Sequence, residues 1–268
     1  MSFKKLFPIS KPIIAMVHLP ALPGSPLYSK SKGIDQIINS AKQDLNALQE
    51  AGVDAIMFGN ENDRPYELNV NVSTTSTMAF VIGTLKKDIK VPFGVNVLWD
   101  PMSTIALAAS TGADFAREIF TGTYASDMGL WNPDAGNALR YRKKVDRDDL
   151  LLFYNVSAEF AYSLDRRPLN ERAKSTVFSS IPDAILVSGP ITGEAVNLNE
   201  IKSVKETVTN IPVLANTGVK INNVKEILDI ADGAIVGSSL KFDGNTWNQV
   251  DQQRAQEFMN EVKKIRNE

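Results

Sequence analysis

Cysteine is absent from this chain of 268 residues, which excludes disulfides, thiolate metal sites and a cysteine nucleophile. A net charge of −2 leaves no basic surplus for a phosphate backbone, so we expect no nucleic-acid partner. No apolar run approaches the ~20 residues that cross a bilayer. Two prolines and a lysine interrupt the first apolar stretch. We therefore expect no membrane insertion, no signal peptide and a cytoplasmic location.

Two common nucleotide-binding motifs are also missing. The chain contains neither GxGxxG nor GxxxxGK[ST], so the sequence does not support the hypothesis of a dinucleotide-binding domain or of a P-loop protein. Its 43% hydrophobic and 22% charged residues are ordinary for a soluble globular protein. Its length is close to the ~250 residues of one (β/α)8 barrel.

Short apolar runs alternate regularly with segments whose apolar residues recur every three or four positions. This pattern predicts eight strand–helix pairs and a single (β/α)8 TIM barrel, one α/β domain over residues 1–268; a doubly wound sheet is the rival. Residues 121–133 are predicted to be a long loop that closes over a ligand. The predicted strands are residues 13–17, 54–58, 91–98, 115–120, 150–156, 184–187, 213–215 and 233–236. The predicted helices are residues 33–52, 74–87, 101–111, 133–144, 171–180, 198–209, 224–231 and 251–266.

The last two predicted strands each lead into a turn of small residues. Glycines let backbone N–H groups approach an anion closely, and a following helix N-terminus adds partial positive charge. The loops after strands 7 and 8 of such barrels often bind phosphate. The alternative is a pair of ordinary tight turns, and two lysines nearby, Lys220 and Lys241, are expected to be solvated or to contact phosphate. The predicted phosphate-binding residues are Asn216, Thr217, Gly218, Gly237 and Ser238.

Three ionisable side chains follow predicted strands and are candidates for general acid–base catalysis. They are His18, the only histidine, Glu61 and Asp165. The C-terminal ends of barrel strands carry the chemistry in this fold. The alternatives are a structural histidine and solvated loop carboxylates. Glu61, Asp63 or Asp165 could instead hold a divalent metal such as Mg²⁺.

Polar residues inside apolar strands, or directly after them, are candidates for substrate contacts. A buried amide or charge needs a partner, so a polar side chain in a barrel strand contacts either a ligand or another side chain. Asn96 is thus a substrate contact or a structural hydrogen bonder, and Arg117 is an anion clamp or half of an internal salt bridge. The substrate-binding candidates are Asn96, Arg117, Ser188, Gly189, Thr192 and Gly193.

An ordered set of short motifs resembles the BtpA/SgcQ family. The motifs are HLPALPGSP at 18–26, GNEND at 59–63, VNVLWDP at 95–101, FAREIF at 115–120, SGPITG at 188–193, ANTGV at 215–219 and DGAIVGSSLK at 232–241. The resemblance implies a ribulose-phosphate-binding barrel with a phosphate pocket at Gly218 and at Gly237-Ser238. It implies no particular reaction, since some members are linked to photosystem I biogenesis and others lie beside sugar-uptake genes.

Two functions from different classes follow. The first is an enzyme acting on a phosphorylated sugar or related small metabolite, by isomerase, lyase or glycosyl-bond chemistry. The second is a non-catalytic phosphate-ligand-binding or assembly factor of the BtpA type, since fold does not imply function. Polar residues after several strands favour the enzyme. We also expect a homo-oligomer, although no self-complementary patch is visible in the sequence.

Overall fold

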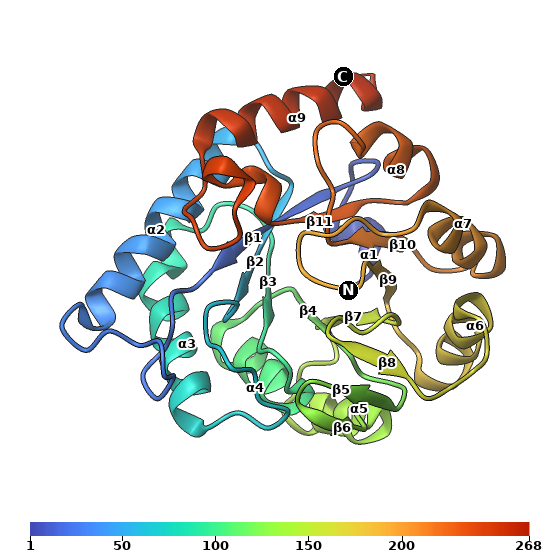
Figure 1. The fold of residues 1–268 in the computed structure, drawn as a ribbon, viewed down its shortest axis with the longest axis horizontal. Helices are drawn as coiled ribbons and strands as arrows, with labels where there is room; N and C mark the ends of the chain where they lie inside the picture. Colours follow the sequence, from blue (N-terminus) through green and yellow to red (C-terminus); the bar gives the residue numbers. More distant parts are fainter. Residues whose placement is uncertain (268) are drawn as a thin grey trace.

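Eight parallel strands close into a barrel in the computed structural model, which describes residues 1–267 (Figure 1). Each strand pairs with the next barrel strand along the chain, and β1 closes the ring by pairing with β11. The predicted barrel is therefore confirmed. The barrel strands are β1 (Ile13–His18), β2 (Ala55–Gly59), β3 (Phe93–Asn96), β4 (Phe115–Glu118), β7 (Leu151–Asn155), β9 (Ala184–Ser188), β10 (Val213–Asn216) and β11 (Ala234–Val236).

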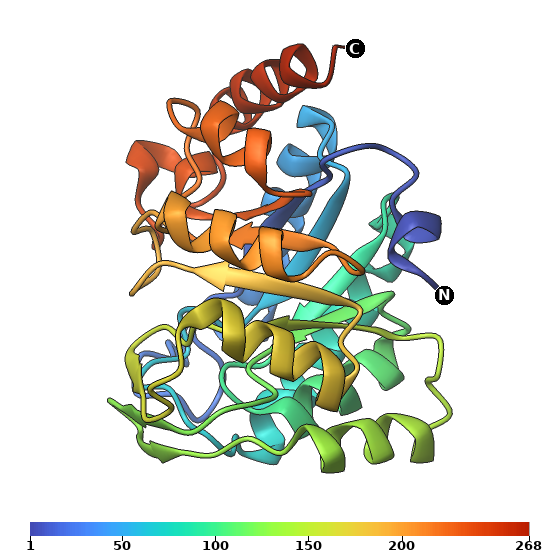
Figure 2. The ribbon, with the colours of Figure 1, turned by 90° about the vertical axis from the view of Figure 1, so that its right-hand side faces the viewer.

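A helix follows each barrel strand and covers the outside of the barrel (Figures 1 and 2). The helix from Pro101 shows how local sequence sets a boundary, because the Asp100 side chain accepts hydrogen bonds from the first-turn N–H groups of Met102 and Ser103. The outer helices are α2 (Gly33–Ala51), α3 (Val72–Leu85), α4 (Pro101–Thr111), α5 (Ala135–Lys144), α6 (Leu169–Ser180), α7 (Leu198–Thr207), α8 (Val224–Ile230) and α9 (Gln252–Arg266). Short 3-10 turns are η1 (Lys86–Asp88), η2 (Ser238–Leu240) and η3 (Phe242–Gly244).

Four aspartates repeat at the starts of alternate barrel strands. Each carboxylate accepts a hydrogen bond from a backbone N–H at the beginning of the preceding barrel strand, at 2.7–3.0 Å. The bond links neighbouring strands at the end of the barrel where the strands begin. We call these the strand-start aspartates: Asp54, Asp114, Asp183 and Asp232.

A short N-terminal helix, α1 (Phe3–Leu6), closes the bottom of the barrel (Figure 2). The Phe3 ring lies 5.7 Å from the Phe153 ring, and Phe7, which follows α1, lies 6.2 Å from Phe115. Phe115 and Phe153 stack at 4.9 Å inside the barrel. The interior is thus a packed aromatic core, and the open end available to a ligand is the C-terminal one.

Residues 121–133 are not the unstructured loop that we predicted. Two short strands there, β5 (Tyr124–Ser126) and β6 (Gly129–Trp131), form an antiparallel sheet with β8 (Ala161–Ser163), which follows β7. The prediction missed a local hairpin between β5 and β6, and it missed the pairing of β5 with β8, a segment far along the chain that local sequence does not reveal. This small sheet builds one side of the barrel mouth.

No helix within residues 1–267 combines the length and the apolar content that crossing a bilayer requires.

Candidate active site

Buried polar side chains gather at the C-terminal ends of the barrel strands, around a central cavity of about 40 Å³. Since charges are costly to bury without partners, each of these groups is held in a network. The residues lining the central cavity are Met16, His18, Glu61, Arg117, Glu159, Thr192, Gly193, Asn216, Thr217, Gly218, Ile235, Gly237 and Ser238.

Glu159 is the hub of this network. Its Oε1 accepts hydrogen bonds from Arg117 Nη2 at 2.6 Å, from Asn216 Nδ2 at 3.1 Å and from Ser188 Oγ at 3.3 Å. Arg117 is only 5% exposed and Glu159 only 3%, so this is a buried ion pair. Of the two roles predicted for Arg117, the structure shows the internal salt bridge, and the role of anion clamp stays a prediction for a side chain that also lines the cavity.

A second carboxylate, Glu61, faces Glu159 through a shared hydroxyl. Thr192 Oγ1 lies 2.9 Å from Glu61 Oε1 and 3.2 Å from Glu159 Oε2. A hydroxyl carries one proton, so it can donate to only one of two carboxylates. Both contacts are hydrogen bonds if one carboxyl is itself protonated and donates to Thr192.

Of the two carboxyls, Glu61 is the one whose surroundings favour the protonated form. Burial raises the pKa of Glu61, and the neighbouring charge of Glu159 raises it further. Glu159, in contrast, has the guanidinium of Arg117 to balance a negative charge. Two carboxyls in different environments are the usual arrangement for a general acid beside a stabilising carboxylate.

His18 ends β1 and is buried beside the same cavity. Burial, followed by the nearby charge of Lys241, holds the pKa of His18 well below its usual value, so the imidazole is neutral. Its Nδ1 is buried and has no hydrogen-bond partner among the described residues. The ring lies against Gly237, where an added Cβ would be 3.1 Å from His18 Cε1. A neutral histidine can donate to, or accept from, a ligand at this point.

Asn96 and Glu118 support the site from the side. Asn96 Oδ1 accepts from Arg117 Nη1 at 2.9 Å, and Asn96 Nδ2 donates to Glu118 Oε1 at 2.7 Å. Burial raises the pKa of Glu118 to about 8. Both side chains are fully buried. Of the two roles predicted for Asn96, the structure shows the hydrogen-bonding one, since Asn96 orients Arg117.

The loop after β9, residues 189–195, lies across the barrel mouth, and we call it the mouth loop. Gly189 N donates to Thr217 Oγ1 at 2.7 Å, and Thr217 Oγ1 donates to the carbonyl of Glu194 at 3.0 Å. Gly218 has a φ of +61°, and a Cβ there would lie 2.3 Å from backbone atoms of Ala195. Glycine at 218 is therefore required for loop packing, whatever ligand it contacts.

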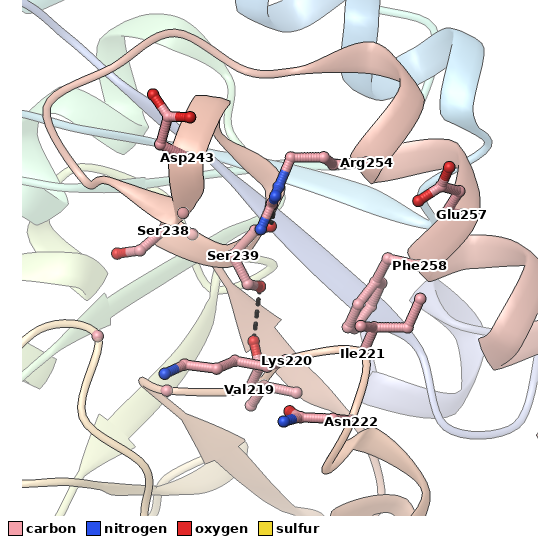
Figure 3. A pocket seen from close by; sticks show the side chains of 14 residues that line it. Val219, Lys220, Ile221, Asn222, Ser238, Ser239, Asp243, Arg254, Glu257 and Phe258 are labelled. Carbon is pink, nitrogen blue, oxygen red and sulfur yellow. Dashed lines mark hydrogen bonds between the residues drawn. The ribbon is translucent and has the colours of Figure 1, made fainter.

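A larger outer cavity of about 440 Å³ adjoins the central one and shares Gly193, Gly218, Gly237 and Ser238 with it (Figure 3). The outer cavity lies between the loop after β10 and the segment formed by η2 and α9. The backbone N–H groups of Gly218, Ser238 and Ser239 have no acceptor within residues 1–267. Such unpaired donors around a cavity are suited to an anion.

Two cationic side chains line the same outer cavity. Arg254 reaches in from α9, with its Nε donating to the carbonyl of Ser239 at 3.3 Å. Lys220 lies opposite, and its amine has no ion-pair partner in the described part of the chain (Figure 3). Free N–H groups and two cations are chemically suited to an anion, although the carboxylates of Asp243 and Glu257 line the same cavity.

Asp165 is not brought to the central cavity. It lines a separate pocket beside Tyr124, and hydrogen bonds from Arg167 hold the pKa of Asp165 at about 2. Asp63 accepts from the backbone N–H of Leu22. The three carboxylates considered as metal ligands therefore have different surroundings: Glu61 lines the central cavity, Asp63 binds the backbone at Leu22, and Asp165 lines a separate pocket. The described residues contain no group of three or more acidic or histidine side chains placed to share a metal ion.

Three site residues were missed or misjudged from the sequence. Glu159 comes three residues after the predicted fifth strand, so its position after a strand end could have revealed it, as it did Glu61. Arg254 lies on the last helix, and no feature of the sequence around it indicated a site residue. Lys241 was expected to be solvated or to contact phosphate, and the first expectation is wrong: Lys241 is 2% exposed, with Nζ donating to the carbonyl of Asn248 at 2.8 Å and lying 3.7 Å from Asp44.

The fold and the site define a (β/α)8 barrel with a polar centre at its C-terminal rim, beside loops that carry unpaired backbone N–H groups. The chain belongs to the BtpA family, whose model matches residues 9–264. It is 46% identical to the sgc region protein SgcQ of Escherichia coli (strain K12), over 98% of both chains. It is 31% identical to the photosystem I biogenesis protein BtpA of Synechocystis sp. (strain PCC 6803), covering 97% of this chain and 90% of that one.

Solved structures with the same fold are much more distant in sequence. Phosphoribosyl anthranilate isomerase from Thermus thermophilus superposes with a TM-score of 0.58 at 11% identity, covering 95% of this chain and 99% of that chain. The similarity supports the barrel and says nothing of the reaction.

Proposed function

We propose that this protein is an enzyme acting on a phosphorylated sugar or a related small metabolite by general acid–base chemistry. The observation that carries the proposal is the adjacency of two features. Glu61 and Glu159 share Thr192 in the central cavity, and the free N–H groups of Ser238 and Ser239 line the adjoining outer cavity. A ligand bound by its phosphate in the outer cavity extends its other end toward the two carboxyls.

Each residue has a separate part in this proposal. Protonated Glu61 supplies a proton to the reacting group, and its carboxylate accepts one in the reverse direction. The Glu159–Arg117 pair stabilises the charge that develops, since both groups are fixed by hydrogen bonds before the ligand arrives. Neutral His18 contacts the ligand from β1. Gly218, Ser238, Lys220 and Arg254 hold the phosphate.

Consumption of sugar phosphates, followed by phosphorus and proton NMR, tests the proposal. At least one member of a panel of pentose and hexose phosphates should be converted, and its unphosphorylated sugar should not. Glu61→Gln keeps the side-chain shape and removes the proton donor, so it should lower kcat by about 10²–10⁴-fold while the ligand still binds. Glu200→Gln, at an exposed position on α7, is the matched control and should leave turnover unchanged. Full turnover by Glu61→Gln would exclude Glu61 as the acid.

A second candidate function is a non-catalytic binding or assembly factor. One observation favours it: the mouth loop leaves a central cavity of only about 40 Å³, which is too small for a sugar until the loop moves. One relative is named as a photosystem I biogenesis protein. A phosphorylated ligand that binds with the same affinity to Glu61→Gln and to the unchanged protein, and that neither converts, would support this function.

A further inference from the structure

We infer that the ligand does not end at its phosphate and that the outer cavity takes a nucleoside group beyond it, which makes the ligand a nucleoside diphosphate sugar. The inference rests on the proposed phosphate site and extends it. Its starting point is the position of the free N–H groups, which lie where the central and outer cavities meet. A phosphate held there faces the outer cavity on one side and, once the mouth loop moves, an enlarged central cavity on the other.

The size of the outer cavity is the first argument. At about 440 Å³ it lies within the ~300–1,000 Å³ range of pockets that enclose whole small molecules, whereas the central cavity measures about 40 Å³. A terminal phosphate would fill only the end of the outer cavity that Gly193, Gly218, Gly237 and Ser238 form. The rest would remain open between the loop after β10 and α9.

The charges inside the outer cavity are the second argument. Lys220 and Arg254 approach from opposite walls, beside Ser238 and Ser239, and the carboxylate of Asp243 also lines the cavity (Figure 3). Arg254 makes one hydrogen bond through Nε, so its terminal N–H groups remain available in the described part of the chain. Two cations around one set of free N–H groups match two linked phosphates better than one.

The far end of the outer cavity has a different character. Ile221 provides the accessible apolar side chain, since Phe258, which also lines the cavity, is only 2% exposed, and Asn222 and Glu257 provide an amide and a carboxylate at the edge (Figure 3). A nucleobase has this combination of an apolar face and a hydrogen-bonding edge. Ile221 is 50% exposed, so its side chain is available for such a contact. The sugar would then extend toward Glu61, the diphosphate would occupy the junction, and the nucleoside would lie against α9.

Calorimetric titration of the full chain tests this inference. The probes are UDP-glucose, GDP-mannose and ADP-ribose, each compared with its sugar monophosphate: glucose 1-phosphate, mannose 1-phosphate and ribose 5-phosphate. At least one nucleoside diphosphate sugar should bind more than about tenfold tighter than its monophosphate. Ile221→Glu should abolish that gain and leave binding of the monophosphate unchanged. Val72→Glu, at an exposed apolar position on α3, is the control and should preserve the gain.

The outcomes separate the two proposals. Sugar monophosphates that bind at least as tightly as the nucleoside diphosphate sugars would overturn the inference and leave the phosphate site standing. An unchanged gain in Ile221→Glu would overturn it as well, because the nucleoside would then lie elsewhere. If neither class of probe binds, both the inference and the proposed phosphate site are wrong.

Discussion

The hydroxyl of Thr192 lies 2.9 Å from Oε1 of Glu61 and holds the mouth loop against a carboxyl that follows β2. The same hydroxyl lies 3.2 Å from Glu159 Oε2. One proton on threonine cannot serve two charged carboxylates, so both contacts are hydrogen bonds only when one of the two glutamic acids is protonated. Protonation of Glu61 would therefore strengthen the contact that holds the mouth loop, and the pKa of Glu61 and the stability of the loop are both accessible to measurement.

The first prediction concerns the pH dependence of stability. Burial and Glu159 raise the pKa of Glu61 in the folded protein. Its contribution to stability is present below the unfolded pKa, about 4.3, and is lost as the pH rises through the folded pKa. The glutamine in Glu61→Gln does not titrate. The free energy of unfolding of Glu61→Gln, relative to that of the unchanged protein, should therefore increase as the pH rises. The gain is about 1.4 kcal/mol per unit of pKa elevation.

Urea unfolding of both proteins from pH 4.5 to pH 8 measures this difference. A difference that stays constant across the range would mean that Glu61 has an ordinary pKa in the folded protein, and the assignment of the shared proton to it would be wrong.

The second prediction concerns the mouth loop. Thr192→Val removes the hydroxyl and keeps the side-chain volume, so the loop loses hydrogen bonds to carboxyls that contribute about 1.5–3 kcal/mol. Amide hydrogen exchange in residues 189–195 should accelerate by at least about tenfold. Thr192→Ser keeps the hydroxyl and should exchange like the unchanged protein. Equal exchange in all three proteins would show that Thr192 does not hold the loop.

The third prediction concerns the strand-start aspartates. Asp232 accepts from Val213 N at 2.8 Å and pairs with Lys205 at 2.5 Å. Asp232→Ala leaves that backbone N–H without its acceptor and should lower the free energy of unfolding by about 1–3 kcal/mol, with the denaturant m-value unchanged. Asp229→Ala, an exposed position on α8, should change it by less than about 0.5 kcal/mol. Equal effects would mean that the strand-start bond contributes nothing beyond surface charge.

The fourth prediction concerns α1, the N-terminal helix that closes the bottom of the barrel. Phe3 lies against Phe7 and Phe153 at the bottom of the barrel. Phe3→Ala opens a cavity there and should cost about 2–4 kcal/mol of unfolding free energy. Lys4→Ala, exposed on the same helix, is the control and should be near neutral in a thermal or urea unfolding experiment. No loss in Phe3→Ala would show that the barrel core is complete without α1.

The features predictable from the sequence are those encoded locally. The barrel strands and outer helices follow from apolar periodicity, and the helix at 101–111 also follows from its Asp100 cap. The placement of Glu61 and His18 follows because a residue just after a barrel strand must lie at the mouth. The family resemblance carried by the ordered motifs is confirmed.

The features that escaped prediction depend on partners distant in sequence. Tyr124 pairs with Ser163 in the small sheet, and the burial of Lys241 depends on Asp44 in α2. Periodicity carries no information on such pairings. The mouth loop shows the same limit. The turn after β9 was recognised as a site loop, but its contact from Thr192 to both carboxyls appears only when the strands are assembled.

Binding of ribose 5-phosphate and ribose, measured by calorimetry on three proteins, tests the central claim most directly. The unchanged protein should bind the phosphate ester and not ribose. Ser238→Glu places a carboxylate among the free N–H groups and should weaken binding at least about tenfold by charge repulsion. Ser179→Glu adds the same charge on exposed α6 and should bind like the unchanged protein. Binding that is insensitive to Ser238→Glu, or equal for ribose and its phosphate, would contradict a phosphate site at the β10 and β11 loops.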